Sequence, residues 1–250
     1  MTMWPVHKIA SIVIGLAAVS AMSAIAGGIT ISPVVIEMSS ARQGVAVTIN
    51  NYGESPITLQ SEAFAWRQTD GVDRDEPTDE LLVVPPIVKI PANASQTFRL
   101  MLHTPNPLPM ERTYHLFLED ITELQAESGA ATLNFRINHI LPILIAPAGK
   151  ILTSIHWKPC ARLDAAKPSV SSKACVRLLN AGNRRVKVQA LTLAGDGWQQ
   201  ALSLKTGENV LAGSEREWHV MLADGQRGAL RGVQVETARG EILQAESGGF

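Results

Sequence analysis

This 250-residue chain has little of what catalysis, metal binding or nucleic-acid binding requires. It carries 22 Lys and Arg against 23 Asp and Glu, so it lacks the basic surplus that binding to nucleic acid demands. Its six histidines are scattered singly, and the sequence shows no nucleophile elbow, glycine-rich phosphate loop or HExxH motif. These absences predict a protein that is not an enzyme and needs neither a cofactor nor a metal.

Long apolar runs are also missing beyond the N-terminus. Residues 1–26 read as a secretory signal peptide, with a short n-region that contains Lys8, an uncharged apolar stretch, and an A-x-A cleavage site at residues 24–26. An uncleaved anchor helix is the alternative, but the short apolar run and the small residues favour cleavage. No later run reaches the roughly 18 residues of a membrane helix. We therefore expect the mature chain to be exported and not inserted in a membrane.

Cysteine is scarce, and the only two, Cys160 and Cys175, lie in the second half of the chain. In an exported protein this pair predicts a disulfide, which would be worth about 3 kcal/mol in the chain-entropy model. A two-thiol metal site is the alternative. It lacks partners, because His156 is the only histidine near the pair in sequence.

Helical periodicity is hard to find, whereas short β-rich runs separated by turn residues recur at spacings of about ten residues. Residues 45–49 and 113–118 alternate apolar and polar side chains, as half-buried strands do. The acidic stretch from Asp70 to Glu80 reads as a surface loop, and residues 146–150 read as a linker. This pattern predicts an all-β protein with two sandwiches in tandem, joined at about residue 148.

The longest predicted strand, TLNFRINHILPILI (132–145), is the most informative segment. Its first half alternates strictly, with Leu133, Phe135 and Ile137 on one side. Its second half is almost wholly apolar and contains Pro142, which favours an edge strand or a bulge. A long apolar edge is an aggregation hazard, and one reason to keep it is to lend it to another protein. By alternation alone, the three apolar residues fit better in the chain's own core.

Six segments then follow one another in an informative order. They are ISPVVIEM (31–38), VTINNYGESPITLQSEAFAWRQTDGVD (47–73), LLVVPPIVKIPANASQTFRL (81–100), RTYHLFLEDI (112–121), LNFRINHILPILIAP (133–147) and LLNAGNRRVKVQALTL (178–193). Together they resemble the periplasmic pilus-assembly chaperones, in the style of the archaic, spore-coat-associated branch. The resemblance implies two immunoglobulin-like β-sandwich domains, at residues 27–147 and 148–250, after the signal peptide.

The resemblance also implies a function, because these chaperones are a known case of strand addition. A member binds a fimbrial subunit that lacks its final strand, inserts its own strand into the gap, and delivers the subunit to an outer-membrane usher. The donated anchors here would be Leu133, Phe135 and Ile137, with His139 and Leu141 continuing the same parity. Each fully buried anchor would contribute roughly 1.5–3 kcal/mol before the costs of ordering.

Two departures limit this resemblance. Better-known members hold the carboxylate of the subunit with an arginine on the first strand and a lysine on the donated strand. Those positions correspond to Val35 and Pro142 here, and neither side chain can bind a carboxylate. Another cation, Arg136 or Arg99, or backbone N–H groups would have to take over.

Other readings stay open at this point. The runner-up is a structural or adhesive β-sandwich protein similar to a fimbrial subunit, although a subunit is normally a single domain. A secreted enzyme would need a convergent set of nucleophile, base and orienting group, which the sequence does not show. An empty donor strand is adhesive, so we also expect that the free chaperone can cap itself as a homodimer.

Overall fold

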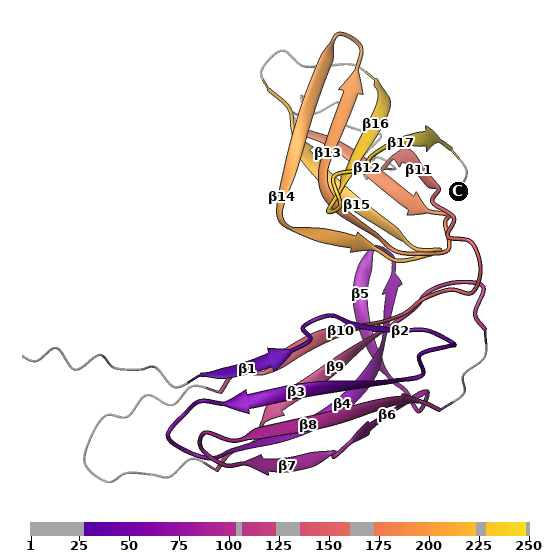
Figure 1. Cartoon of the computed structure of the whole chain (residues 1–250). Coiled ribbons are helices and arrows are strands. Elements are labelled where there is room, and N and C mark those ends of the chain that lie inside the picture. Colours follow the sequence, from indigo (N-terminus) through magenta and orange to yellow (C-terminus); the bar gives the residue numbers. More distant parts are fainter. Residues whose placement is uncertain (1–27, 104–106, 124–135, 161–172, 224–228, 249–250) are drawn as a thin grey trace, which may run out of the picture.

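Alternating apolar and polar residues fold this chain into two β-sandwiches set at an angle to one another (Figure 1). The computed structural model describes residues 28–103, 107–123, 136–160, 173–223 and 229–248. All regular elements within these ranges are strands, and none of the described segments is a helix long and apolar enough to cross a membrane. The predicted all-β fold class is confirmed.

The N-terminal domain contains β1 to β10. Their bounds are β1 (Ile29–Ser32), β2 (Ile36–Met38), β3 (Gly44–Asn51), β4 (Ile57–Thr69), β5 (Val72–Pro77), β6 (Leu81–Val84), β7 (Ile87–Ile90), β8 (Ser95–Leu102), β9 (Arg112–Asp120) and β10 (His139–Ile145). One sheet has the order β1-β3-β8-β6. The other has the order β2-β10-β9-β4-β5, with β7 also pairing with β4.

Side chains from both sheets fill the core between them. Val47, Phe98 and Leu100 come from the first sheet, and Leu116 and Ile143 from the second; all five are fully buried. Every one of them follows from the period of two, because alternate residues of a strand point to the same face of the sheet. The same rule leaves an outer face on each sheet, and these outer faces carry the surfaces described below.

Two segments need separate description. The segment at residues 29–38 is not one continuous strand, because it breaks at Pro33, so that β1 lies in one sheet and β2 in the other. The acidic stretch that we expected to be a loop instead contains β5, which pairs with β4 from Thr69↔Val72 to Phe64↔Pro77. All six residues of β5 are exposed, so no apolar alternation marks it as a strand in the sequence.

The C-terminal domain contains β11 to β17. Their bounds are β11 (Ile155–Pro159), β12 (Lys173–Asn180), β13 (Val186–Gly195), β14 (Trp198–Val210), β15 (Glu215–Met221), β16 (Leu230–Thr237) and β17 (Ile242–Ser247). They follow the order β14-β13-β16-β17-β11-β12-β15 around a second, separate core. The predicted disulfide is present between Cys160 and Cys175, whose Cα atoms are 5.4 Å apart.

Candidate functional site

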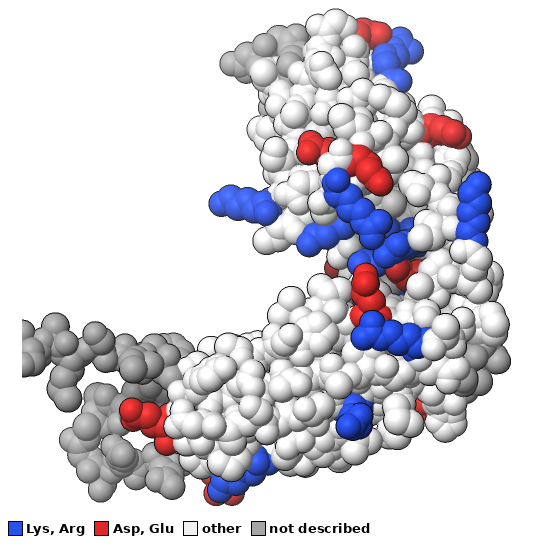
Figure 2. All heavy atoms as spheres, in the orientation of Figure 1, with Lys and Arg blue, Asp and Glu red and all other residues white. Residues whose placement is uncertain are grey.

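The two domains enclose a broad concave side. In Figure 1 it is bounded by β1, β2 and β10 of the N-terminal domain and by β14 of the C-terminal domain. Figure 2 shows that this side is hollowed and that the N-terminal domain presents few charged side chains to it. A surface of this kind suits a large apolar partner better than a small ion.

Strand β10 offers a free edge toward this side. It pairs with β9 along its whole length, from His139↔Leu118 to Ile145↔Arg112. Its other edge pairs with β2 only from Ile143 to Ile145. Among the described residues, nothing pairs with that edge of β10 from His139 to Pro142, so its backbone groups there are available to a strand from another chain.

The predicted donor residues divide into four groups. Leu133 and Phe135 lie outside the described residues. Ile137, which precedes β10, is 63% exposed. Leu141 is only 7% exposed and packs in the core of the N-terminal domain, so a donor role for it conflicts with its position. His139 is half-buried on the same side, and its Nε2 atom is buried without a hydrogen-bond partner.

The two cations proposed to replace the family's clamp lie elsewhere. Arg99 is exposed on β8, in the sheet that does not contain β10. Arg136 donates a hydrogen bond to the Thr122 carbonyl oxygen at 2.8 Å, before the start of β10 and therefore at the end opposite the domain junction. Neither residue is among those that line the cavity at the junction, where Ile145 leads into the linker.

Different cations line the junction. A cavity of about 220 Å³ lies between the domains. Arg42 and Arg184 line it, together with Glu37, Glu111 and the apolar side chain of Leu144. Arg42 is exposed, and within the described part of the chain its guanidinium has no ion-pair partner. The residues of this site come from distant segments of the sequence, so no single motif predicts it. The adjacent Arg184 and Arg185, in the turn before β13, are the one signal that the sequence offers among these residues.

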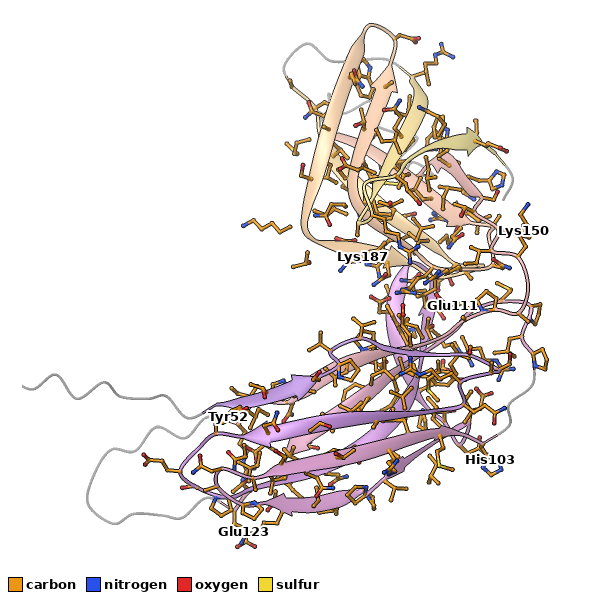
Figure 3. All side chains as sticks on the ribbon, in the orientation of Figure 1. Tyr52, His103, Glu111, Glu123, Lys150 and Lys187 are labelled. Carbon is orange, nitrogen blue, oxygen red and sulfur yellow. A yellow bond between two sulfur atoms is a disulfide. The ribbon has the colours of Figure 1, made fainter. Side chains whose placement is uncertain are left out.

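The carboxylate of Glu111 organises this junction (Figure 3). Its side chain is 2% exposed, and it accepts hydrogen bonds from the Arg185 backbone N–H at 3.0 Å and from the Arg185 guanidinium at 2.8 Å. Burial lowers the pKa of Arg185, and the nearby Glu111 carboxylate only partly offsets this effect. Arg184 lies 3.5 Å from Glu111 and 3.9 Å from Glu37, so it is shared between two carboxylates.

A second cavity, of about 270 Å³, opens at the end of the N-terminal sandwich beside Tyr114, Glu80 and Arg112. The Tyr114 hydroxyl donates a hydrogen bond to Glu80, and Arg112 lies 3.1 Å from the same carboxylate. Burial, followed by the hydrogen bond to Glu80, raises the pKa of Tyr114 to about 12. The hydroxyl therefore stays protonated and acts here as a structural donor.

Aromatic side chains cover part of the outer face of the β10 sheet. The ring of Trp66 stacks on that of His115, with centroids 4.4 Å apart, and Phe64 meets Phe117 edge-on at 4.9 Å. His115 is opposite Pro142 in the β9–β10 register. The position where a clamp lysine would stand is therefore flanked by a histidine, whose Nδ1 atom lies 2.7 Å from Asp75.

The outer face of the other sheet carries an apolar patch around Arg99, which we call the β6–β8 patch. It consists of Leu82, Val84 and Met101, which are 52%, 46% and 51% exposed. The β6–β8 register places Leu82 beside Met101 and Val84 beside Arg99. Since β6 is the last strand of its sheet, this patch adjoins a second open edge.

Comparisons with known proteins agree with this architecture. Residues 28–150 match the family model described as pili and flagellar-assembly chaperone, PapD N-terminal domain. A comparison with curated protein sequences finds no match.

Among solved structures, the chain is similar to one of the CsuC–CsuE chaperone–tip adhesion subunit complex of archaic Csu pili from Acinetobacter baumannii. That match has a TM-score of 0.67 and 16% identity, and it covers 89% of this chain and 100% of the other. The class 5 fimbriae chaperone CfaA gives 0.57 and 14%, covering 87% and 99%. The SafA pilin–SafB chaperone complex of Salmonella enterica gives 0.56 and 16%, covering 88% and 96%. At these identities the structural matches establish the shared fold.

Proposed function

The chain belongs to the PapD-like family of pilus and flagellar-assembly chaperones through its N-terminal domain, and from this premise we propose that it is a periplasmic chaperone that completes a pilus subunit with its own strand. A chaperone role in pilus assembly follows from the family and the fold. Strand donation, the location of the subunit, and delivery to an outer-membrane usher are the further steps of the proposal.

The free edge of β10 is the observation that carries the proposal. From His139 to Pro142 the strand has backbone groups available on one side, and the exposed Ile137 stands immediately before it. A subunit strand could pair with this edge while apolar side chains of the chaperone fill the subunit's groove. Leu133, Phe135 and Ile137 form the donor set of this proposal, and Leu141 is left in the chaperone's own core.

The junction cavity is the best place for the carboxylate of a bound subunit. Val35 and Pro142 supply no charge, whereas Arg42 and Arg184 both reach this cavity. An arginine can hold a carboxylate through two parallel N–H···O bonds, which a lysine cannot do. Arg42 is the better candidate, because Arg184 already lies near Glu111 and Glu37.

Delivery to an usher requires a surface that stays accessible while the concave side is occupied. The β6–β8 patch meets this condition, because it lies on the outer face of the sheet that does not contain β10. Its exposed apolar side chains surround a single arginine, a composition typical of the centre of protein interfaces. We therefore assign usher docking to this patch and subunit binding to the concave side.

A periplasmic capture experiment tests the proposal. Tagged wild-type chain should retain a small exported β-rich subunit, identified by mass spectrometry, and Phe135→Arg with Ile137→Arg should lose it. Ile242→Arg is the matched control, because Ile242 is 67% exposed on β17 of the other domain. Equal capture by the donor variant, with folding verified by circular dichroism, would refute donation. Sedimentation of the free protein should show whether the same substitutions also abolish a self-capping dimer.

A further inference from the structure

The hairpin of β4 and β5 extends beyond its own sheet. Strand β4 pairs with β9 only as far as Ala65↔Tyr114, whereas β5 continues along β4 to the turn at Asp70 and Gly71. The part from Trp66 to Asp75 is thus a two-stranded arm, which rises from the N-terminal domain to the C-terminal domain (Figure 1). Donation of β10 does not require such an arm.

The arm is attached to the C-terminal domain by one side-chain amide. Gln68 donates a hydrogen bond to the Asn209 carbonyl oxygen at 2.8 Å and accepts one from the Leu211 backbone N–H at 2.9 Å. The same pair of bonds would be made by a neighbouring strand. Because both partners are backbone groups at the end of β14, the attachment depends on where that backbone lies, not on which side chains it carries.

An ion pair and an apolar contact reinforce the attachment. Arg216, on β15, donates a hydrogen bond to Asp73 at 2.6 Å, and Asp73 also accepts bonds from the side chains of Gln68 and Trp66. Leu211 packs against Trp66 and Leu144, and all three side chains are buried. Burial acts to raise the pKa of Asp73, but the bonds from Arg216, Gln68 and Trp66 outweigh it and hold the pKa below its ordinary value.

The tip of the arm lies against β15, the last strand of its sheet. Asp70 and Gly71 both have positive φ angles, 53° and 75°, which a tight two-residue hairpin turn requires. A Cβ atom at Gly71 would lie 3.6 Å from the Arg216 Cα atom and 3.7 Å from the Glu215 carbonyl oxygen. The backbone of the tip therefore lies so close to that of the other domain that one added carbon atom would be in van der Waals contact with it.

Two attachments hold a domain more firmly than one. The linker and the Glu111–Arg185 contact form a first attachment at one side of the junction, about which the domains could still rotate. The arm forms a second attachment at a different point (Figure 1). We propose that the β4–β5 arm is a strut that fixes the angle between the domains, with Gln68 as its central positioning residue.

A fixed angle has a consequence for binding, which rests on the proposed function. If the angle varied, only a fraction of free molecules would have the concave side open to the width that a subunit fits, and the apparent affinity would fall by that fraction. The strut removes this loss by setting that width before the subunit arrives. It is a positioning device; at its base Trp66 packs against Leu144 of β10, beyond the free edge that runs from His139 to Pro142.

Residual dipolar couplings of the mature chain, with its disulfide intact, test the strut without any partner. In the wild type, one alignment tensor should fit both domains. In Gln68→Ala with Asp73→Asn, the two domains should require separate tensors. Arg67→Ala, the exposed neighbour on the same strand, should keep the common tensor. A common tensor in the double variant, or its loss in the control, would overturn the proposal.

A second variant and a second readout complete the design. If the double variant does not fold, Asp73→Asn alone is the milder substitution, because it removes only the charge that faces Arg216. A single alignment tensor should then fit the two domains less well than in the wild type. Subunit capture by the loosened variant should fall several-fold. Separate tensors with undiminished capture would overturn the link to subunit binding. Suppose that the tensors separate in Gln68→Ala with Asp73→Asn, but that Phe135→Arg with Ile137→Arg leaves subunit capture intact. The strut proposal then holds, and the strand-donation proposal fails.

Discussion

Substituting Glu111 by Gln should weaken the coupling between the two domains. Glu111 immediately precedes β9, and 2% of its side chain is exposed; its carboxylate accepts hydrogen bonds from both the backbone and the guanidinium of Arg185 in the other domain. Glutamine has the same size and keeps one acceptor oxygen, so it can retain the bond from the Arg185 backbone. It loses the negative charge that compensates the two guanidinium groups beside it, Arg184 and Arg185.

The magnitude follows from what is left unpaired. Breaking a buried ion pair by removing one partner costs about 3–5 kcal/mol, because the other charge stays buried. Arg185 is 18% exposed and Arg184 21%, and Arg184 retains Glu37 at 3.9 Å, so part of this cost is relieved. A hydrogen bond to a charged group is worth about 1.5–3 kcal/mol, and the glutamine side chain would keep one of the two bonds. We expect a loss of about 2–3 kcal/mol in the free energy of unfolding.

Urea denaturation followed by tryptophan fluorescence measures this loss. Trp66 reports on the junction, and Trp157, Trp198 and Trp218 report on the core of the C-terminal domain. Glu119→Gln, an exposed site on the same strand, is the matched control and should change stability by less than about 0.5 kcal/mol. A Glu111→Gln protein as stable as this control would refute the reasoning.

A double substitution separates loss of a partner from loss of a contact. Replacing both members of a buried polar pair with apolar groups of similar shape can be nearly neutral. Glu111→Leu with Arg185→Met should therefore be more stable than Glu111→Leu alone. If the double variant is the less stable of the two, the buried arginine is not the source of the penalty.

Three further outcomes follow from single features of the structure. Phe98→Ala, at a fully buried core position, should destabilise the N-terminal domain by about 3–5 kcal/mol in urea denaturation. Replacing Cys160 and Cys175 by Ser should cost about 3 kcal/mol, measured in the same way on the C-terminal domain. The pKa of Asp73 is held below 3.8, so its ion pair with Arg216 is intact at neutral pH and is lost only as the pH falls through that lowered value. In the wild type, the alignment tensors of the two domains should separate in that pH range. Asp73→Asn should show no such step.

Local patterning accounts for the parts of the fold that were predicted from the sequence. The alternating run at 45–49 lies in β3, and the run at 113–118 lies in β9, because each strand buries one face in a sandwich. Strand β5 lacks that signal. Its residues are exposed on both faces, and it forms because β4 offers it a pairing edge and the Asp70-Gly71 turn returns the chain.

The candidate site was harder to predict, because it depends on which segments meet. Alternation placed Leu141 and Ile137 on one side of the strand, but it cannot show where the domain's own core ends. Arg99 and Arg136 were chosen as cations near the right segments in sequence, whereas Arg42 and Arg184 reach the junction from a loop and from the other domain. No pattern within a single segment reports such a meeting.

The break at Pro33 connects these observations. Strand β2 pairs with β10 only as far back as Ile36, because the preceding chain crosses to the other sheet, where β1 pairs with β3. Had the first strand continued beside β10, it would have covered the edge from Pro142 back to His139. On one face of β10, the side chains from Ile145 back to Leu141 belong to the core of the domain. Further back along the chain, the alternation places Ile137 on the same side, and its side chain is exposed. The point at which the first strand leaves the sheet therefore sets both where the domain's own core ends and where the edge offered to a partner begins.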